Sequence, residues 1–128
     1  MTRNLHIVFS RPPEGISDEE FNGWYDAHLG EILRAPGFMS AQRYRLDPVV
    51  SESDTPVPYG YLAVYEIDGD PATAIEELER LGMGSKDSYA ELKEADSGDL
   101  ELPAWWDRAH FASWNCVALG ERVEAPSP

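Results

Sequence analysis

The chain has 128 residues, enough for a single domain with a hydrophobic core of its own. Its 24 acidic residues outnumber the 10 basic residues, which gives a formal net charge of −14. A field of that sign repels phosphate backbones and anionic lipid headgroups, so we expect neither a nucleic acid nor a membrane surface as a partner.

The cysteine usage and the N-terminus indicate the compartment. Cys116 is the single cysteine and lies in an apolar run, so it has no partner within the chain for a disulfide. One unpaired thiol is typical of a reducing compartment. The first apolar run is too short for a signal peptide. We therefore expect a soluble, cytoplasmic protein.

The first predicted elements are a strand and a helix. Alternating residues at 4–10 predict the strand, with apolar character on both faces. Ser17, followed three residues later by Glu20, forms a capping box that begins the helix. The helix is predicted to run to about Arg34 and to end at a turn that contains Gly37.

Two more strands, a second helix and a last strand follow. Alternation predicts strands at 38–46 and 59–67. Asp70 is a suitable N-cap, with proline at the first helical position, and Gly82 ends the helix that follows. The final strand is predicted at 110–119.

The resulting order is βαββαβ, which predicts an α+β, ferredoxin-like fold. This fold has a four-stranded antiparallel sheet with two helices on one face. We expect residues 1–120 to form this one domain and residues 121–128 to be a flexible tail. Because the strands are apolar on both sides, the uncovered sheet face predicts a homodimer, with two sheets packed face to face.

His28 lies on the apolar face of the first helix. The residues of this face recur at helical spacing: Phe21, Trp24, Tyr25, His28, Leu29, Ile32 and Leu33. An imidazole among such neighbours is either a hydrogen-bonded core residue or a general acid/base, and spacing alone favours the core residue. Burial would lower its pKa and keep the ring neutral and able to accept a proton.

Tyrosines of the third predicted strand are candidate partners for this imidazole. Tyr61 and Tyr65 share one strand face. Each either packs over the first helix or donates its hydroxyl to a substrate carbonyl, and we prefer Tyr65, which lies in mid-strand, as the donor. Trp24 and Tyr25 are expected to shape the substrate cavity rather than react.

Further candidates come from the last part of the chain and from the second strand. Asn115 could orient His28 or bind a carbonyl, or it could face the dimer interface. Trp105 and Trp106 either cap the pocket or close a satellite core beneath the preceding loop. Arg43 is expected first to pair with acidic side chains and only second to bind a substrate carboxylate.

No metal or cofactor is expected. His6 and His110 have no metal-ligand spacing. His28 and Glu31 match half of a di-iron motif, whose second half is absent. The chain also has no glycine-rich phosphate loop and no serine-hydrolase elbow.

The chain resembles the dimeric α/β-barrel superfamily, and within it the EthD-like branch. The resemblance is carried by FNGWYDAHL at 21–29, ILRAPGF at 32–38, Arg43-Tyr44 and YLAVYEI at 61–67. It covers residues 5–80 well and the last strand by topology only. It implies a homodimer with a pocket in each subunit, between the sheet and its helices. The segments 47–58 and 82–103 depart from the simplest members and leave the substrate open.

Members of this superfamily include cofactor-free polyketide cyclases, lactone isomerases and lyases, and small-aromatic monooxygenases. The resemblance implies a cofactor-independent isomerase, cyclase or lyase that acts by proton transfer on a small apolar, aromatic or polyketide-like carbonyl compound. His28 would be the general acid/base, and Tyr65 would stabilise the oxyanion. The alternatives are a cofactor-free monooxygenase of a phenolic compound and a non-catalytic small-molecule binding protein.

Overall fold

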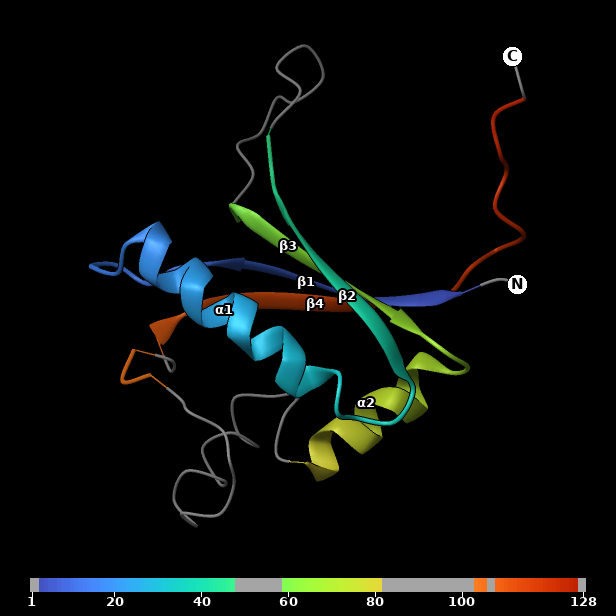
Figure 1. Cartoon of the computed structure of the whole chain (residues 1–128), viewed down its shortest axis with the longest axis horizontal. Helices are drawn as coiled ribbons and strands as arrows, with labels where there is room; N and C mark the ends of the chain where they lie inside the picture. Colours follow the sequence, from blue (N-terminus) through green and yellow to red (C-terminus); the bar gives the residue numbers. More distant parts are fainter. Residues whose placement is uncertain (1–2, 48–58, 82–102, 106–107, 127–128) are drawn as a thin grey trace.

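In the part of the chain that the structure describes, four strands and two helices follow one another in the predicted order (Figure 1). The computed structural model describes residues 3–47, 59–81, 103–105 and 108–126. Its elements are β1 (Asn4–Arg11), α1 (Asp18–Ile32), β2 (Phe38–Arg45), β3 (Tyr61–Ile67), α2 (Pro71–Arg80) and β4 (His110–Cys116). Neither helix has the length and apolar character that a membrane crossing requires.

The strands form one antiparallel sheet in the order β2-β3-β1-β4. Both helices lie on the same side of this sheet (Figure 1). The predicted ferredoxin-like fold is therefore confirmed.

Both helices begin where the sequence predicts. The Ser17 side chain accepts a hydrogen bond from the Glu20 backbone N–H at 3.1 Å. The Asp70 side chain accepts one from the Ala72 N–H at 3.2 Å, and Pro71 occupies the first turn of α2. Such caps satisfy backbone donors that have no partner within the helix.

Two elements end earlier in the structure than the sequence predicts. α1 ends at Ile32, because the backbone bonds of the next residues tighten into a turn, with Ala35 N–H donating to the Ile32 carbonyl at 3.0 Å. β4 ends at Cys116 rather than at residue 119. Beyond this point the Ala118 N–H donates to the Asn4 side chain at 2.9 Å, in place of a backbone hydrogen bond between strands.

The turn after α1 brings β2 close to α2. Gly37 has a φ of 95°, which favours glycine, and a Cβ atom there would lie 3.1 Å from the Ala74 Cβ. The Gly37 carbonyl accepts a bond from the Asp68 N–H at 2.9 Å. A side chain at this position would therefore strain the turn and press on α2.

The strand register divides the side chains between two faces. On the face that carries the helices, Ala63, Tyr65 and Ile67 of β3 are buried, and their partners on β1 are Val8, His6 and Asn4. We call this the helix-side face. The opposite face, which we call the open face, is formed by the alternate residues of the strands, including Leu5, Ile7, Phe9, Leu62, Val64, Ala112 and Trp114.

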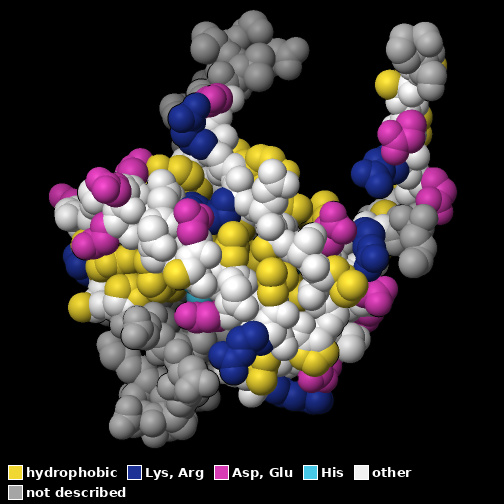
Figure 2. All heavy atoms as spheres, in the orientation of Figure 1, with side chains coloured by type: hydrophobic (Ala, Val, Ile, Leu, Met, Phe, Trp, Pro, Cys, Tyr) yellow, Lys and Arg dark blue, Asp and Glu magenta, His cyan; other side chains and the backbone are white. Residues whose placement is uncertain are grey.

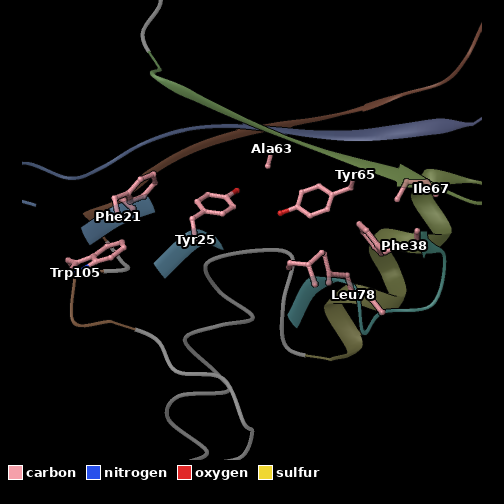
Figure 3. Packing of buried hydrophobic residues seen from close by; sticks show 12 residues of the cluster. Phe21, Tyr25, Phe38, Ala63, Tyr65, Ile67, Leu78 and Trp105 are labelled. Atoms are coloured by element: carbon pink, nitrogen blue, oxygen red, sulfur yellow. The ribbon is translucent and has the colours of Figure 1, made fainter. Parts of the chain in front are cut away.

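The hydrophobic core lies between the helix-side face and the two helices (Figure 3). Its buried members are Phe21, Tyr25, Ile32, Ala35, Phe38, Ala63, Tyr65, Ile67, Ala74, Leu78, Trp105 and Ala109. Two of them, Tyr25 and Tyr65, carry hydroxyl groups into this layer, so the core is not uniformly apolar.

Candidate functional site

The buried face of α1 carries His28 as predicted. His28 is 5% exposed, and its ring stacks on Trp24 with the ring centroids 4.8 Å apart and an interplanar angle of 15°. The Tyr25 ring meets the imidazole edge-on, at a centroid distance of 5.9 Å. Two aromatic rings therefore fix the plane of this imidazole.

Burial keeps His28 neutral. It lowers the pKa of the imidazole to about 4, in the direction that the sequence predicts. The His28 Nδ1 lies 3.4 Å from Oε2 of Glu31, a long contact within the same helix. At neutral pH the ring is therefore uncharged and able to accept a proton.

Two buried tyrosines, one from α1 and one from β3, meet in the core. In Figure 3 the hydroxyl oxygens of Tyr25 and Tyr65 point toward one another, and the two side chains are hydrogen-bonded. The small side chain of Ala63 lies beside this meeting point (Figure 3). Burial raises the pKa of Tyr25 to about 12, so its hydroxyl stays protonated and can donate a hydrogen bond.

A second imidazole continues this arrangement on the sheet. His6 lies opposite Tyr65 in the β1–β3 register, and the two ring centroids are 6.0 Å apart. Its other neighbour is Asn115 of β4, whose Oδ1 lies 2.8 Å from the His6 Nδ1. Because an amide oxygen only accepts, Nδ1 carries the hydrogen, and in the neutral ring Nε2 carries the lone pair.

The pKa of His6 is lowered by its burial, and the bond to Asn115 opposes part of that change. Four polar rings thus follow one another between α1 and the sheet. We call them the aromatic row: His28, Tyr25, Tyr65 and His6. Asn115 lies at the His6 end of the row.

Arg43 of β2 lies against the middle of the row. Its guanidinium carbon is 4.4 Å from the centroid of the Tyr25 ring and 5.2 Å from that of Tyr61. Its terminal nitrogens donate to Asp26 at 3.1 Å and to Asn22 at 2.8 Å. The predicted pairing with acidic side chains is confirmed, and the cation favours the ionised form of Tyr25, in opposition to burial.

The remaining predicted site residues lie elsewhere. The Tyr61 hydroxyl donates to Asp18 at 2.6 Å, so it does not join the hydroxyl pair of the row. Trp105 is buried against Phe21 and Trp24, at centroid distances of 5.7 and 5.4 Å, which agrees with the core alternative. Trp106 lies outside the described residues.

The prediction that Asn115 orients His28 is wrong, because Asn115 is bonded to His6 instead. The β1–β4 register puts Asn115 directly opposite His6, on the helix-side face. Sequence reasoning also left the orientation of His6 open. Its alternation with Val8 and Ser10 on one strand face was the available signal, and burial of Ser10 shows which side that face occupies.

Among the described residues, no group of three or more His, Cys, Asp or Glu side chains could hold a metal ion. His28 and Glu31, which match half of a di-iron motif in the sequence, are in contact. In the structure it joins a buried imidazole to a neighbouring carboxylate of one helix.

No family model matches the sequence, and no curated protein is similar to it in sequence. Solved structures are similar in fold. HapK from Hahella chejuensis aligns over 96% of this chain and 99% of its own, with a TM-score of 0.56 and 16% identity. The Arabidopsis thaliana protein At3g17210 aligns over 94% of this chain and 99% of its own, with a TM-score of 0.56 and 9% identity.

A third similar structure aligns with a lower TM-score. It is an ethyl tert-butyl ether d (EthD) family protein from Bacillus halodurans, with a TM-score of 0.47 and 15% identity over 95% of this chain and 100% of its own. At such identities the similarity concerns the fold alone.

Proposed function

We propose that the chain is a cofactor-independent enzyme that transfers a proton next to the carbonyl group of a small apolar, aromatic or polyketide-like compound. The observation that carries this proposal is the buried pair of tyrosine hydroxyls between two neutral imidazoles. Isomerisation and aldol-type cyclisation of such compounds both begin with this kind of proton transfer.

In this proposal the hydroxyl pair binds the carbonyl oxygen. The hydrogen bond between Tyr25 and Tyr65 would be exchanged for bonds to the substrate, and Tyr65 would donate to the oxygen as negative charge develops on it. Because the phenol of Tyr25 has a raised pKa, it remains a donor throughout the physiological range. Trp24 supplies an aromatic surface beside His28 against which an apolar substrate can stack.

One of the two imidazoles would take the proton. His28 is the residue that the sequence pattern predicts, and its pKa of about 4 makes it neutral but a weak base. His6 is held by a 2.8 Å bond to Asn115, which fixes the ring and leaves the lone pair on Nε2. Both rings are held in place, but the bond to Asn115 also assigns the lone pair of His6 to one nitrogen, Nε2. We therefore infer that His6 is the general base, with Asn115 as its positioning residue.

The experiment is a hydrogen–deuterium exchange assay that needs no knowledge of the final product. The protein is incubated in heavy water with a panel of aryl ketones and 1,3-diketones, and exchange next to the carbonyl is followed by NMR. Wild type should accelerate exchange of at least one compound, and Tyr65→Phe should slow it by about 10- to 1000-fold.

The matched control is Tyr44→Phe, which removes a phenol hydroxyl from an exposed residue of β2. It should exchange as fast as wild type. If a compound binds but neither wild type nor any variant exchanges its protons, the non-catalytic binding function replaces this proposal.

A further inference from the structure

One edge of the Arg43 guanidinium has an unused donor. The two terminal nitrogens donate to Asp26 and Asn22. Of the buried side-chain nitrogens and oxygens in the part of the chain that the structure describes, only the Nε of Arg43 lacks a hydrogen-bond partner. Leaving a buried donor unpaired is destabilising, and nearly all such groups in folded proteins have a partner. The Nε–H of Arg43 is therefore a donor whose acceptor the described residues do not supply.

The neighbours of Arg43 hold its guanidinium in a fixed orientation. The guanidinium carbon lies 4.4 Å from the centroid of the Tyr25 ring and 5.2 Å from that of Tyr61. The Tyr61 hydroxyl donates to Asp18 and is also bonded to Asn22. Asn22 in turn accepts from Arg43, so these contacts form one network. A planar fork of donors that is held in this way binds a carboxylate with little loss of side-chain freedom.

Arg43 also lies close to the hydroxyl pair of the aromatic row. In the β2–β3 register it is opposite Ala63, whose side chain lies beside the meeting point of the Tyr25 and Tyr65 hydroxyls (Figure 3). Its guanidinium lies over the ring of Tyr25, which carries one of these hydroxyls. One small compound can therefore reach both the hydroxyl pair and the Nε of Arg43.

The ion pair between Arg43 and Asp26 joins a buried cation to an exposed anion, with the side chains 11% and 67% exposed. A carboxylate so exposed returns to water at small cost, so the pair can be exchanged. Figure 2 shows acidic side chains gathered around the start of α1, where Asp18, Glu19 and Glu20 form the first turn. This negative surface repels small inorganic anions, so we expect an anion at Arg43 to be part of an aromatic or apolar molecule.

We propose that Arg43 binds a carboxylate of the substrate, and that the substrate is an aryl or polyketide-like keto acid. The Nε of Arg43 donates to one carboxylate oxygen and a terminal nitrogen donates to the other, while Asp26 turns to solvent. The ketone oxygen lies at the hydroxyl pair of Tyr25 and Tyr65, and in this respect the assignment rests on the proposed function. Arg43 is then the residue that selects a keto acid over the corresponding neutral ketone.

The first test compares the dissociation constants of the acetylbenzoate isomers with those of their uncharged methyl esters, measured by isothermal titration calorimetry. Wild type should bind at least one acid about 10- to 100-fold more tightly than its ester, the usual effect of hydrogen bonds to a charged group. Arg43→Lys keeps the positive charge but not the planar fork, and it should reduce this preference to about threefold or less.

The control for this substitution is Arg45→Lys, at an exposed position of the same strand, which should keep the full preference. Thermal melting of both variants checks that they fold. Equal affinity of wild type for acid and ester, or a full preference in Arg43→Lys, would overturn the proposal.

The second test removes the competing anion. Asp26→Asn keeps the size of this exposed side chain but not its charge, and it should tighten binding of the preferred acetylbenzoate about threefold while the ester binds as before. The control is Glu76→Gln, at an exposed position of α2, which changes the net charge equally and should leave both constants unchanged. An Asp26→Asn variant that binds the acid no more tightly than wild type would overturn the exchange of Asp26 for a substrate carboxylate.

These binding constants need no turnover, so the role of Arg43 and the proposed function fail separately. If wild type accelerates hydrogen–deuterium exchange of neutral ketones but shows no preference for the acids, only the role of Arg43 is overturned. If Arg43 confers the preference for an acid but no compound exchanges its protons, the proposed function is overturned and Arg43 anchors the ligand of a keto-acid binding protein.

Discussion

On the helix-side face of the sheet, imidazole and phenol groups are buried and meet one another, whereas on the open face Trp114 and Tyr44 are exposed. The two faces are built from alternate residues of the same strands, so a register slip of one residue would exchange them. Burial of polar groups costs free energy unless they are paired, and exposure of apolar groups costs free energy unless a partner covers them. The imidazole and phenol groups of the helix-side face have polar partners there, whereas the apolar side chains of the open face are left uncovered by the single chain.

The largest expected effect concerns the proton acceptor of the helix-side face. His6→Gln keeps a polar side chain beside Asn115 but removes the basic nitrogen. It should reduce the rate of catalysed hydrogen–deuterium exchange by about 10²- to 10⁴-fold. His110→Gln, at an exposed position of β4, is the control and should match wild type. If His28→Gln abolishes exchange while His6→Gln does not, then the general base is His28.

The next largest effect is the pH dependence of stability that His28 imposes. Its folded-state pKa of about 4 lies below the ordinary value of 6.5, so the unfolded state binds more protons between these values. The contribution of the neutral His28 to the free energy of unfolding is complete above pH 6.5. It is lost as the pH falls toward 4, and the total loss is about 3 kcal/mol.

Urea unfolding of wild type and His28→Gln at several pH values checks this. The difference between the two free energies of unfolding should shrink by that amount on acidification. A difference that is independent of pH would mean that another group, for example His6, binds more protons in the unfolded than in the folded state.

Arg43 gives the third effect. Arg43→Met removes the contacts of the guanidinium with Asp26, Asn22 and two tyrosine rings, and it should cost about 2 kcal/mol. Arg45→Met is the control on the same strand face, because Arg45 is exposed and pairs with the exposed Asp47. It should change the free energy of unfolding by less than about 0.5 kcal/mol. Equal losses of unfolding free energy in the two variants would show that Arg43 does not stabilise the aromatic row.

The smallest expected effect is on the open face. Trp114→Ala should cost a single chain about 1 kcal/mol, because half of this side chain is already in water and its main aromatic neighbour is Phe9, 5.7 Å away. Chemical unfolding at low protein concentration measures this. A cost above about 3 kcal/mol would indicate that the open face is packed within one chain.

The element order and both helix starts could be predicted because local chemistry determines them. Ser17 and Asp70 are capping residues, and the alternation in the strands depends only on neighbouring positions. The end of β4 could not be predicted, because it depends on Asn4, which is distant in the sequence.

The candidate site could be predicted only where it lies on one element. His28 and its aromatic neighbours share a helix, so their spacing in the sequence predicts that they lie on one face. The pair of His6 and Asn115 depends on the register of two strands far apart in sequence, and a shift of one residue would separate them. The hydroxyl contact between Tyr25 and Tyr65 depends on the distance between α1 and the sheet, which a sequence pattern does not contain.

The central claim is that the helix-side face holds a neutral, oriented imidazole ready to accept a proton. Nitrogen-15 NMR of the histidine side chains at neutral pH tests it without a substrate. The account predicts that His6 is neutral, with a protonated Nδ1 and an unprotonated Nε2. A charged His6 ring, or a hydrogen on Nε2 in place of Nδ1, would contradict it.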